Sequence, residues 1–559
     1  MKQSPYFAAA LALFAGAACS AAHAPAPAAP AAPTTAAITE ADLRQRLFLI
    51  ADDSMMGRES GSLGNYKTAD YVASEFKRLG LEPAGENGSY FQTVPLWVAA
   101  VDARSRIEVG GVELRLGSDF LPTSLYAGAR SLDGVQAIYG GPIDDTTKWI
   151  SPEQAAGKLV VIDLPPGVPR RGLAIGPRWR QAAATAVVTL DAIGPETVAS
   201  LREGRPVADT TRNPNLMPSL WLSRRAAVEL LGADPSTLAP GTTGAPLHGW
   251  FDFSRTPVKY PARNVIAILR GSDPALRGEY VSLSAHNDHV GFDHHPVDHD
   301  SLRAFDRVIR PMGADSPERT PTAAEWTRIH ALLDSLRKVH APRLDSIRNG
   351  ADDDGSGTVA LLEIAESMAL SGTRPRRSIL FVNHMGEEAG LLGSKWFTDH
   401  PTVPIDSIVG EIDEDMVGRG LPDDYPLDGV KAASPTYMEV VGAKRLSREF
   451  GDSIEAANAR EPLPFNFDYR YDAPGHPLQY YCRADHYNYA RYGIPAVALS
   501  RGEHLDYHQV TDEAQYIDYP DLARVTRMVR SAALVLANMA HRPKLDVPKP
   551  SDPHVQCRQ

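Results

Sequence analysis

Apolar residues recur at different spacings in different parts of the chain. Between residues 39 and 85 they recur every three or four positions on both sides of a Gly-rich turn, which predicts two helices. From about 100 to 250 the apolar runs are short or alternating and are separated by Gly and Pro, as in SRIEVGGVELRL and GKLVVIDLP. This second pattern predicts a separate β-rich module.

From residue 263 onwards, apolar strands alternate with amphipathic helices. We expect strands at NVIAILRG, EYVSLSAH, RSILFVNH, SIVGEID and IPAVALS, and helices at GTVALLEIAESMALS, GLLGSKWFTDH and about 519 to 541. Two segments interrupt this order: 293–348 is polar and then helical, and 421–480 is rich in Pro, Tyr and charge. The alternation predicts an α/β fold, in which a mixed, mostly parallel sheet is covered by helices on both faces.

Length and charge restrict the class of protein. A chain of 559 residues exceeds one compact unit, which favours two or three domains. Hydrophobic residues make up 43% and charged residues 23%, as in an ordinary globular protein. The net charge is -12 and no long basic run is present, so nucleic acid is not an expected partner.

The N-terminus has the layout of a secretory signal. A lysine is followed by a short apolar run, small residues and a Pro/Ala-rich tract, which we read as a signal peptide over 1–24 and a linker over 25–38. The apolar run is too short for a permanent membrane span. Cleavage after Ala24 and lipid attachment at Cys19 both remain open. Either route predicts an extracytoplasmic protein, periplasmic or secreted.

The chain has three cysteines, Cys19, Cys482 and Cys557. Their spacing matches neither a zinc finger nor a disulfide scaffold. In an oxidising compartment, Cys482 and Cys557 either form one bridge or stay as free thiols, and the sequence leaves both alternatives open.

Acidic and histidine side chains follow four of the predicted strands. The carboxyl ends of parallel strands meet at one edge of a sheet, where α/β proteins bind their ligands. Each short motif alone is common in solvated loops, but their order and their positions at strand ends point to one shared site. These side chains are His286 and Asp288, Glu387 and Glu388, Asp413 and Asp415, and His508, with Asp352, Asp353 and Asp354 opening the helix between the first two strands.

Two histidines with several carboxylates form a suitable ligand set for zinc. Two Zn²⁺ ions carry four positive charges, which three carboxylates and one bridging hydroxide balance, while two neutral histidines complete the coordination. The run DDDGSG also resembles a calcium loop. It lacks the alternating aspartates of that motif and has no glutamate in the proper register.

These motifs resemble the family of co-catalytic di-zinc aminopeptidases, whose relatives include glutamate carboxypeptidase, transferrin receptor and the glutaminyl cyclases. The matching stretches are AHNDHVG, GADDDGSGTVALLE, GEEAGLLGS, DMVGR, ADHYNYARYGIPAV and DYHQVTDE, in the family's order from about 265 to 520. The early GRESGSLGNYKTADYVASEFKRLGLEPAG is similar to that family's N-terminal segment. In the motif ADHY, Ala484 replaces the usual serine.

The resemblance implies a role for each matched residue. Asp353 would bridge two zinc ions, and a cis peptide bond would join it to Asp354, while Asp352 looks replaceable. Glu387 would be the general base. Asp288 would accept a hydrogen bond from a zinc-bound imidazole, and Tyr507 is a candidate donor to the oxyanion. The other zinc ligands would be His286 and Asp415 on the first ion, with Asp413 as a rival of Asp415, and Glu388 and His508 on the second.

The same resemblance implies a zinc-dependent aminopeptidase that hydrolyses the N-terminal residues of peptides through a metal-bridging hydroxide. A carboxypeptidase or dipeptidase on the same site is an alternative, as is a non-catalytic receptor-like relative. Only about 50 residues follow His508, which is too short for the helical dimerisation domain of the glutamate carboxypeptidases. The sequence leaves the oligomeric state open. Candidates for binding the substrate's terminal ammonium are Glu503, Asp485 and Asp354.

We therefore expect the N-terminal part of a peptidase domain, an inserted β-rich protease-associated domain, the di-zinc peptidase domain and a short tail. The helical insertion 293–348 should lie near the metals and narrow the cleft. His289, His294, His295 and His299 could bind extra metal, but we expect them to be exposed loop histidines. The expected boundaries are 39–122, 123–252, 253–542 and 543–559.

Overall fold

The computed structural model describes residues 34–125, 127–165, 178–208, 217–317, 319–420, 435–555, 557 and 559. The expected signal peptide 1–24, with Cys19, and most of the linker 25–38 lie outside the described residues. Among the helices that are described, none combines the length and the apolar character that a bilayer span requires.

Nine of the described strands form one mixed sheet, called the central sheet below. They are β1 (Glu82–Pro83), β2 (Phe91–Val94), β15 (Ala262–Leu269), β16 (Tyr280–His286), β19 (Ser378–His384), β20 (Ile408–Glu414), β21 (Tyr437–Val441), β22 (Asn466–Asp468) and β23 (Ala496–Ser500). Their order is β1-β15-β19-β16-β20-β23-β21-β22, and β2 also pairs with β15. The middle strands β19, β16, β20 and β23 are parallel, whereas β15 and β21 pair antiparallel to them.

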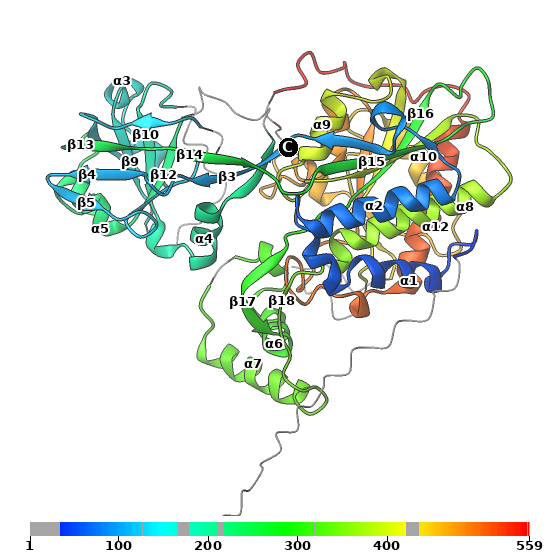
Figure 1. The fold of residues 1–559 in the computed structure, drawn as a ribbon, viewed down its shortest axis with the longest axis horizontal. Helices are drawn as coiled ribbons and strands as arrows, with labels where there is room; N and C mark the ends of the chain where they lie inside the picture. Colours follow the sequence, from blue (N-terminus) through cyan, green and yellow to red (C-terminus); the bar gives the residue numbers. More distant parts are fainter. Residues whose placement is uncertain are drawn as a thin grey trace, which may run out of the picture. The chain divides into compact units, whose positions relative to one another are not determined.

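Helices cover both faces of the central sheet (Figure 1). Along β19, Ile379 and Phe381 belong to one apolar core and Leu380 and Val382 to another, because successive side chains of a strand point to opposite faces. This arrangement confirms the predicted α/β fold. The first core includes α1 (Glu40–Ile50), α2 (Leu63–Arg78), α8 (Gly357–Leu370), α10 (Arg448–Asn458) and α12 (Tyr519–Asn538), and the second includes α9 (Leu392–Asp399) and α11 (His486–Ala490).

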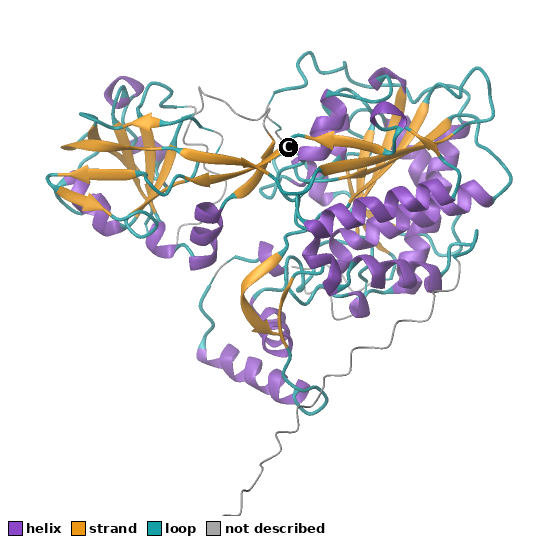
Figure 2. Cartoon of the chain, in the orientation of Figure 1, coloured by secondary structure: helices purple, strands orange, loops and turns teal. Residues whose placement is uncertain are grey.

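The β-rich segment forms a second sheet with its own apolar core, and both sheets are coloured as strands in Figure 2. Its strands are β4 (Arg106–Val109), β5 (Val112–Leu114), β6 (Phe120–Pro122), β7 (Arg130–Ser131), β8 (Gln136–Pro142), β9 (Leu159–Asp163), β10 (Ala184–Val188), β12 (Ser219–Leu222) and β13 (Thr243–Phe251). Because β4, β5 and β6 precede residue 123, this sheet extends beyond the segment expected from the sequence.

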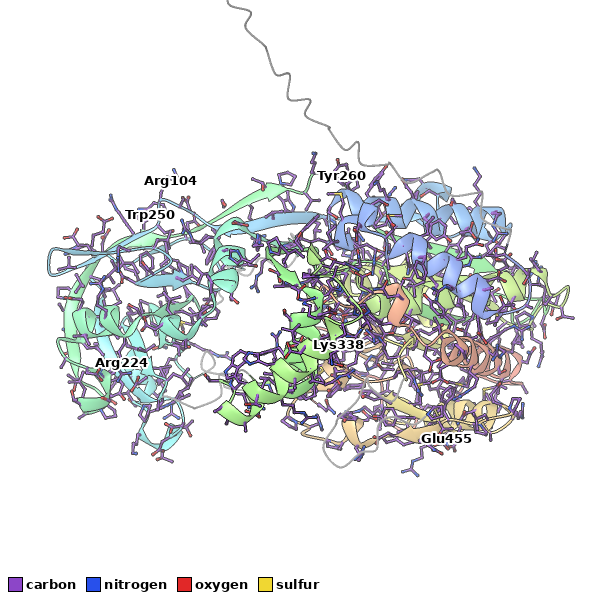
Figure 3. The ribbon with its side chains drawn as sticks, turned by 90° about the horizontal axis from the view of Figure 1, so that it is seen from below. Arg104, Arg224, Trp250, Tyr260, Lys338 and Glu455 are labelled. Carbon is purple, nitrogen blue, oxygen red and sulfur yellow. A yellow bond between two sulfur atoms is a disulfide. The ribbon has the colours of Figure 1, made fainter. Side chains whose placement is uncertain are left out.

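Smaller elements complete this β-rich region. A three-stranded sheet contains β3 (Leu96–Val101), β11 (Arg205–Ala208) and β14 (Phe253–Pro257), and the helices are α3 (Pro152–Ala155), α4 (Pro195–Glu203) and α5 (Arg224–Leu231). Figure 3 labels Arg104 and Trp250 of this region. The guanidinium of Arg104 lies 5.9 Å from the ring centre of Trp250.

The two segments that interrupt the strand and helix order have different structures. The first contains a hairpin of β17 (Phe292–Asp298) and β18 (Leu344–Ile347) and the helices α6 (His299–Ile309) and α7 (Ala323–Leu336). The second, 421–480, is described only from residue 435. It contributes β21 and β22 to the central sheet, so it is not wholly an insertion.

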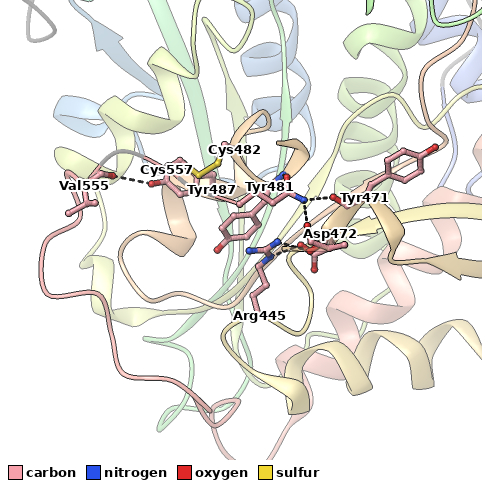
Figure 4. Close-up of a disulfide and its surroundings, with 10 residues drawn as sticks. Arg445, Tyr471, Asp472, Tyr481, Cys482, Tyr487, Val555 and Cys557 are labelled. Carbon is pink, nitrogen blue, oxygen red and sulfur yellow. Dashed lines mark hydrogen bonds and ion pairs between the residues drawn. A yellow bond between two sulfur atoms is a disulfide. The ribbon is translucent and has the colours of Figure 1, made fainter. Parts of the chain in front are cut away.

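A disulfide joins Cys482 to Cys557 (Figure 4). It fastens the C-terminal tail beside the central sheet, where the hydroxyl of Tyr487 also donates a hydrogen bond to the carbonyl oxygen of Val555 at 3.3 Å. Of the two alternatives that the sequence left open, the structure has the bridge.

Candidate metal centre

The predicted ligands lie at one edge of the central sheet. His286 is the last residue of β16, and Glu387 and Glu388 follow the end of β19 after a short turn. Asp415 comes directly after β20, and His508 lies in the segment that follows β23. Parallel pairing of these four strands brings residues more than 200 positions apart to one place.

Asp353 lies between two groups of candidate ligand atoms. Nε2 of His286 is 3.2 Å from Oδ1 of Asp353 and 3.7 Å from Oδ1 of Asp415. On the other side, Nε2 of His508 is 3.0 Å from Oδ2 of Asp353 and 3.0 Å from Oε2 of Glu388. The two carboxylate oxygens of Asp353 therefore face two different sets of ligands.

The spacing of these atoms fits metal ions. Ligand atoms bound to one tetrahedral zinc ion are about 3.3 Å apart, close to the separations seen here. Nε2 of His286, Nε2 of His508 and Oδ2 of Asp353 are buried, and among the described residues they have no hydrogen-bond partner. Such orphaned buried atoms are costly unless something else binds them, and a cation would satisfy all three.

The charges of this cluster depend on one another. Burial alone would raise the pKa of Asp353, but the neighbouring imidazoles of His286 and His508 hold it well below its ordinary value. Burial would likewise lower the pKa of His508, but Glu388 and Asp353 raise it to about 10. The carboxylates thus favour positive charge on the imidazoles, and a metal ion would replace those protons, since histidine binds metal when neutral.

The three aspartates of DDDGSG have different surroundings. Oδ2 of Asp354 accepts a hydrogen bond from the amide of His286 at 3.0 Å, and Oδ1 accepts one from the amide of Gly357 at 2.9 Å. Oδ1 of Asp352 accepts from the amide of Gly418 at 2.6 Å. The peptide bond between Asp353 and Asp354 is cis, as the resemblance implied.

The expectation that Asp352 is replaceable is not supported by its surroundings. Its side chain is fully buried, and Oδ2 lies 3.2 Å from Nε2 of His504. Because Nδ1 of His504 accepts from the amide of Asp506, its Nε2 carries the proton and faces the carboxylate of Asp352. The triplet is therefore a folded turn in which all three carboxylates are used.

Asp288 contacts two residues of the site, His286 and Glu387. Its carbonyl oxygen lies 3.1 Å from Nδ1 of His286, whereas its carboxylate is farther away, at 3.6 Å. That carboxylate instead accepts hydrogen bonds from the hydroxyl of Ser60 at 2.7 Å and from the amide of Glu387 at 3.2 Å. The imidazole is thus oriented mainly by the main chain, in contrast to the carboxylate contact expected from the sequence.

Asp413, the rival of Asp415, is directed elsewhere. Its carboxylate accepts hydrogen bonds from the hydroxyl of Ser284 at 3.0 Å and from the amide of His486 at 3.1 Å. Asp413 lies within β20, which ends at Glu414, whereas Asp415 follows the end of the strand.

His289 is a residue that sequence reasoning misjudged. It was expected to be exposed, but its side chain is buried, and Nδ1 lies 2.8 Å from Oε1 of Glu388 and 3.7 Å from Oδ2 of Asp353. In the sequence, its position three residues after the predicted ligand His286 could have indicated that it lies near the metal groups. His299 is also buried and lies 2.9 Å from Asp345, whereas His294 and His295 are exposed as expected.

Arg58 is a second residue that the sequence did not reveal. Its buried guanidinium donates hydrogen bonds to the carbonyl oxygens of Asn287, at 3.2 Å, Asn349, at 2.5 Å, and Gly350, at 2.8 Å. These carbonyls belong to the two segments that carry His286 and Asp353. Arg58 therefore fixes one ligand-bearing segment against the other.

A cavity of about 340 Å³ opens beside the metal groups. Glu387 lines it, with Oε2 4.0 Å from Nε2 of His286, and burial raises the pKa of Glu387 well above its ordinary value. Tyr507 also lines it and stacks on His508 with ring centres 4.0 Å apart. Burial raises the pKa of Tyr507, so its hydroxyl keeps a proton to donate. Of the candidate ammonium ligands, Glu503 lines the cavity.

The insertion 293–348 lies near the site, as expected. Its Gly313 adopts a φ of 51°, and a Cβ there would lie 2.4 Å from the carbonyl oxygen of Tyr507, so only glycine permits this approach. Next to it, Asp315 lies 2.6 Å from Arg483 of the cavity wall. The insertion thus packs against two residues that line the cavity, Tyr507 and Arg483.

Comparison with known proteins agrees with this arrangement. The sequence model of Peptidase family M28 matches residues 264–533. The chain is 33% identical over 97 residues to Leupeptin-inactivating enzyme 1 of Streptomyces exfoliatus, which covers 17% of this chain and 22% of that protein. It is 30% identical over 191 residues to a Vacuolar membrane protease of Candida glabrata, covering 34% and 18%. The chain thus spans less than a quarter of the length of these two relatives.

A solved structure extends the likeness to most of the chain. The Aminopeptidase from Aneurinibacillus sp. strain AM-1 aligns with a TM-score of 0.50 and 16% identity, over 92% of this chain and 97% of that one. At this identity the likeness concerns the fold. It agrees with the predicted α/β fold.

Proposed function

We propose that this chain, whose residues 264–533 match the sequence model of Peptidase family M28, is a zinc-dependent aminopeptidase that removes N-terminal residues from peptides. The observation that carries the proposal is the position of Asp353 between two ligand groups, at the mouth of a cavity that Glu387 also lines. A shared carboxylate beside a free one suits hydrolysis assisted by two metal ions.

Two zinc ions per chain would fit these ligands. His286, Asp353 and Asp415 would hold the first ion, and Asp353, Glu388 and His508 the second. When bound, the pair would lower the pKa of a water molecule to about 7 and polarise the scissile carbonyl.

Three residues of the chain would have different roles in hydrolysis. Glu387 accepts the proton of the attacking water and passes it to the leaving amine, the role of a general base followed by a general acid. Tyr507 donates a hydrogen bond to the oxyanion that forms at the carbonyl carbon. Asp288 acts indirectly, because its main chain orients His286 and its carboxylate holds the amide of Glu387.

Exopeptidase activity agrees with the size of the cavity. Its volume of about 340 Å³ suits one side chain rather than an extended peptide, and Asp315 of the insertion 293–348 contacts Arg483 of the cavity wall. An aminopeptidase is also among the relatives, a Probable leucine aminopeptidase of Arthroderma otae that is 29% identical over 108 residues. Carboxypeptidase or dipeptidase activity on the same ligands is the alternative, since those reactions need the same metal pair.

The chain's organisation and location belong to the same proposal. We place the enzyme outside the cytoplasm, with a signal peptide over 1–24, a linker over 25–38 and either a free N-terminus or a lipid on Cys19. The segment 123–252 would be a protease-associated module, enlarged by the preceding strands β4, β5 and β6. The peptidase would then occupy 39–122 and 253–542, followed by a tail over 543–559.

Hydrolysis of matched substrates tests the proposal. Zinc-loaded protein should hydrolyse leucyl-aminomethylcoumarin and leave its N-acetyl derivative intact, because an aminopeptidase requires a free terminal amine. Glu387→Gln should abolish turnover while zinc content stays unchanged, which separates loss of the base from loss of metal. Equal cleavage of free and blocked substrates, or cleavage from the carboxyl terminus, would overturn the assignment.

A further inference from the structure

Two carboxylates are buried in the cavity beside the metal groups, and the proposed hydrolysis does not use them. Glu439 and Glu503 line the cavity together with Glu387 and Glu388, and only 3% and 5% of their surfaces are exposed. Glutamate is seldom buried without a partner, because removing a charge from water is costly. Their presence in this wall therefore calls for a counterpart.

The register of the central sheet fixes how far Glu439 lies from the metal groups. Glu439 on β21 pairs with Ser500 on β23, and on the opposite side of β23 the amide of Asp415 donates to the carbonyl oxygen of Leu499 at 3.2 Å. Glu439 and Asp415 are therefore separated by two strand spacings, about 10 Å. Glu439 lies along the cavity from the metal groups, at a side chain's length from the reacting bond.

Strand alternation directs Glu439 into the cavity. Met438 and Val440 point to the opposite face and belong to the first apolar core, whereas Glu439 and Val441 line the cavity. Across β23, Ala498 offers only a small side chain. Small and apolar neighbours leave room for a long side chain whose end would meet the carboxylate.

Within the described residues, Glu439 and Glu503 each have a carboxyl oxygen without a partner. Oε2 of Glu439 and Oε2 of Glu503 have no hydrogen-bond partner. Arg483 is the only basic side chain among the described residues that line the cavity, and it lies 4.0 Å from Glu503. It is closer to Asp315, at 2.6 Å, so its charge is already matched. Arg483 thus faces three acidic side chains, Asp315, Glu439 and Glu503, and the wall remains acidic.

The electrostatic environment agrees with this geometry. Burial, followed by the negative charge of Glu503, raises the pKa of Glu439 well above its ordinary value. Burial, together with Glu503 and Glu439, also raises the pKa of Tyr480, whose ring lines the same cavity. An aromatic ring beside carboxylates is a favourable surrounding for an organic cation.

We infer that this cavity selects substrates whose N-terminal residue is lysine or arginine, with the cationic end of that side chain bound by Glu439 and Glu503. The inference rests on the proposed function. The α-ammonium of any substrate stays beside the scissile bond, whereas the charge of lysine is carried on a four-carbon stem that reaches farther along the cavity. The distance of Glu439 from Asp415 suits the side-chain cation of lysine and not the α-ammonium.

Turnover of an isosteric pair tests the inference. Lysyl- and norleucyl-aminomethylcoumarin share a linear side chain and differ in the terminal ammonium. We expect zinc-loaded protein to show a kcat/KM at least about tenfold higher for lysine. Glu439→Gln should remove most of this ratio and leave kcat/KM for norleucine within about threefold of wild type. Glu229→Gln, an exposed glutamate on α5, is the matched control and should leave the ratio unchanged.

A binding measurement distinguishes failure of this inference from failure of the proposed function. Calorimetry with zinc-loaded protein should give tighter binding of lysinamide than of norleucinamide, and Glu439→Gln should abolish the difference. If lysinamide binds more tightly but no aminoacyl substrate is hydrolysed, the proposed function fails and the cationic cavity stands. If norleucyl substrates are hydrolysed as well as lysyl substrates, with a free amine still required, the inference is overturned while the aminopeptidase stands.

Discussion

Nδ1 of His289 lies 2.8 Å from Oε1 of Glu388, inside the second group of candidate metal ligands. The imidazole is fully buried and packs edge to face against His508, with ring centres 5.4 Å apart. Among the described residues, neither ring nitrogen of His289 has a hydrogen bond of good geometry. His289 therefore either binds the second ion or holds Glu388 in place, and both roles support metal binding.

Replacing His289 should weaken binding of the second ion. We expect His289→Ala to lower zinc affinity about 10- to 100-fold, the usual loss when a neighbour that orients a ligand is removed. A competition titration with a zinc-binding dye measures this loss. His294→Ala is the control, because that exposed histidine lies in the same segment. Unchanged affinity in His289→Ala would remove the residue from the centre.

The aspartates of the triplet should fail in different ways. Asp353→Asn should abolish zinc binding and hydrolysis together, because its two oxygens face both ligand groups. Asp352→Asn should reduce the free energy of unfolding by about 1 to 3 kcal/mol, since an amide placed against the proton of His504 leaves a buried donor unsatisfied. Urea unfolding and metal analysis of both variants separate the two effects. Identical behaviour would contradict the distinction.

A buried charge network fastens three helices of the first core. Arg46 of α1 lies 2.6 Å from Glu363 and 2.5 Å from Glu366, both on α8, and 2.6 Å from Glu75 of α2. Arg78 adds a second positive charge at 2.8 Å from Glu75. Three carboxylates thus share two guanidinium groups. Burial, opposed by Arg46, raises the pKa of Glu363 to about 7.

This raised pKa gives stability a pH dependence of defined sign. A carboxyl group whose pKa is higher in the folded state stabilises the fold fully below its unfolded pKa, here 4.5, and loses that contribution as the pH rises to about 7. The loss from Glu363 amounts to about 3 kcal/mol. The free energy of unfolding, measured with urea, should therefore differ less between pH 4.5 and pH 8 for Glu363→Gln than for wild type. Glu229→Gln should keep the wild-type difference. An equal difference in the free energy of unfolding between the two pH values for all three proteins would refute the assignment.

The disulfide should contribute to stability through the unfolded chain. It joins residues 75 positions apart, and closing a loop of that length in the unfolded state stabilises the fold by about 4 kcal/mol. Cys557→Ser should lower the urea midpoint, and dithiothreitol should lower the wild-type midpoint equally. Dithiothreitol should not affect the variant. A midpoint in wild type that does not respond to reduction would contradict this contribution.

The sequence predicted that His286, Glu388, Asp415 and His508 lie close together. This prediction depends on a general property of parallel sheets, whose strands have their carboxyl ends at one edge. The strands β16, β19, β20 and β23 are rich in apolar residues and alternate with predicted helices, so the sequence identified them directly. The choice of Asp353 within the triplet came instead from resemblance, since three adjacent carboxylates cannot be ranked by pattern.

The residues that sequence reasoning missed belong to irregular segments. Arg58 and His289 act from turns, where no periodicity indicates burial, and their roles depend on segments far away in the chain. Strand β21 was hidden for a different reason. Its run YMEVV carries Glu439 in the middle, and a charged residue in a buried strand imitates a polar insertion.

Zinc titration of metal-depleted protein tests the central claim most directly. Hydrolysis of leucyl-aminomethylcoumarin should be absent without metal, rise as zinc is added and reach its plateau at two equivalents per chain. Asp353→Asn should show no activity at any zinc concentration. Full hydrolysis in the metal-free protein, or a plateau at one equivalent, would contradict a pair of ions bridged by Asp353.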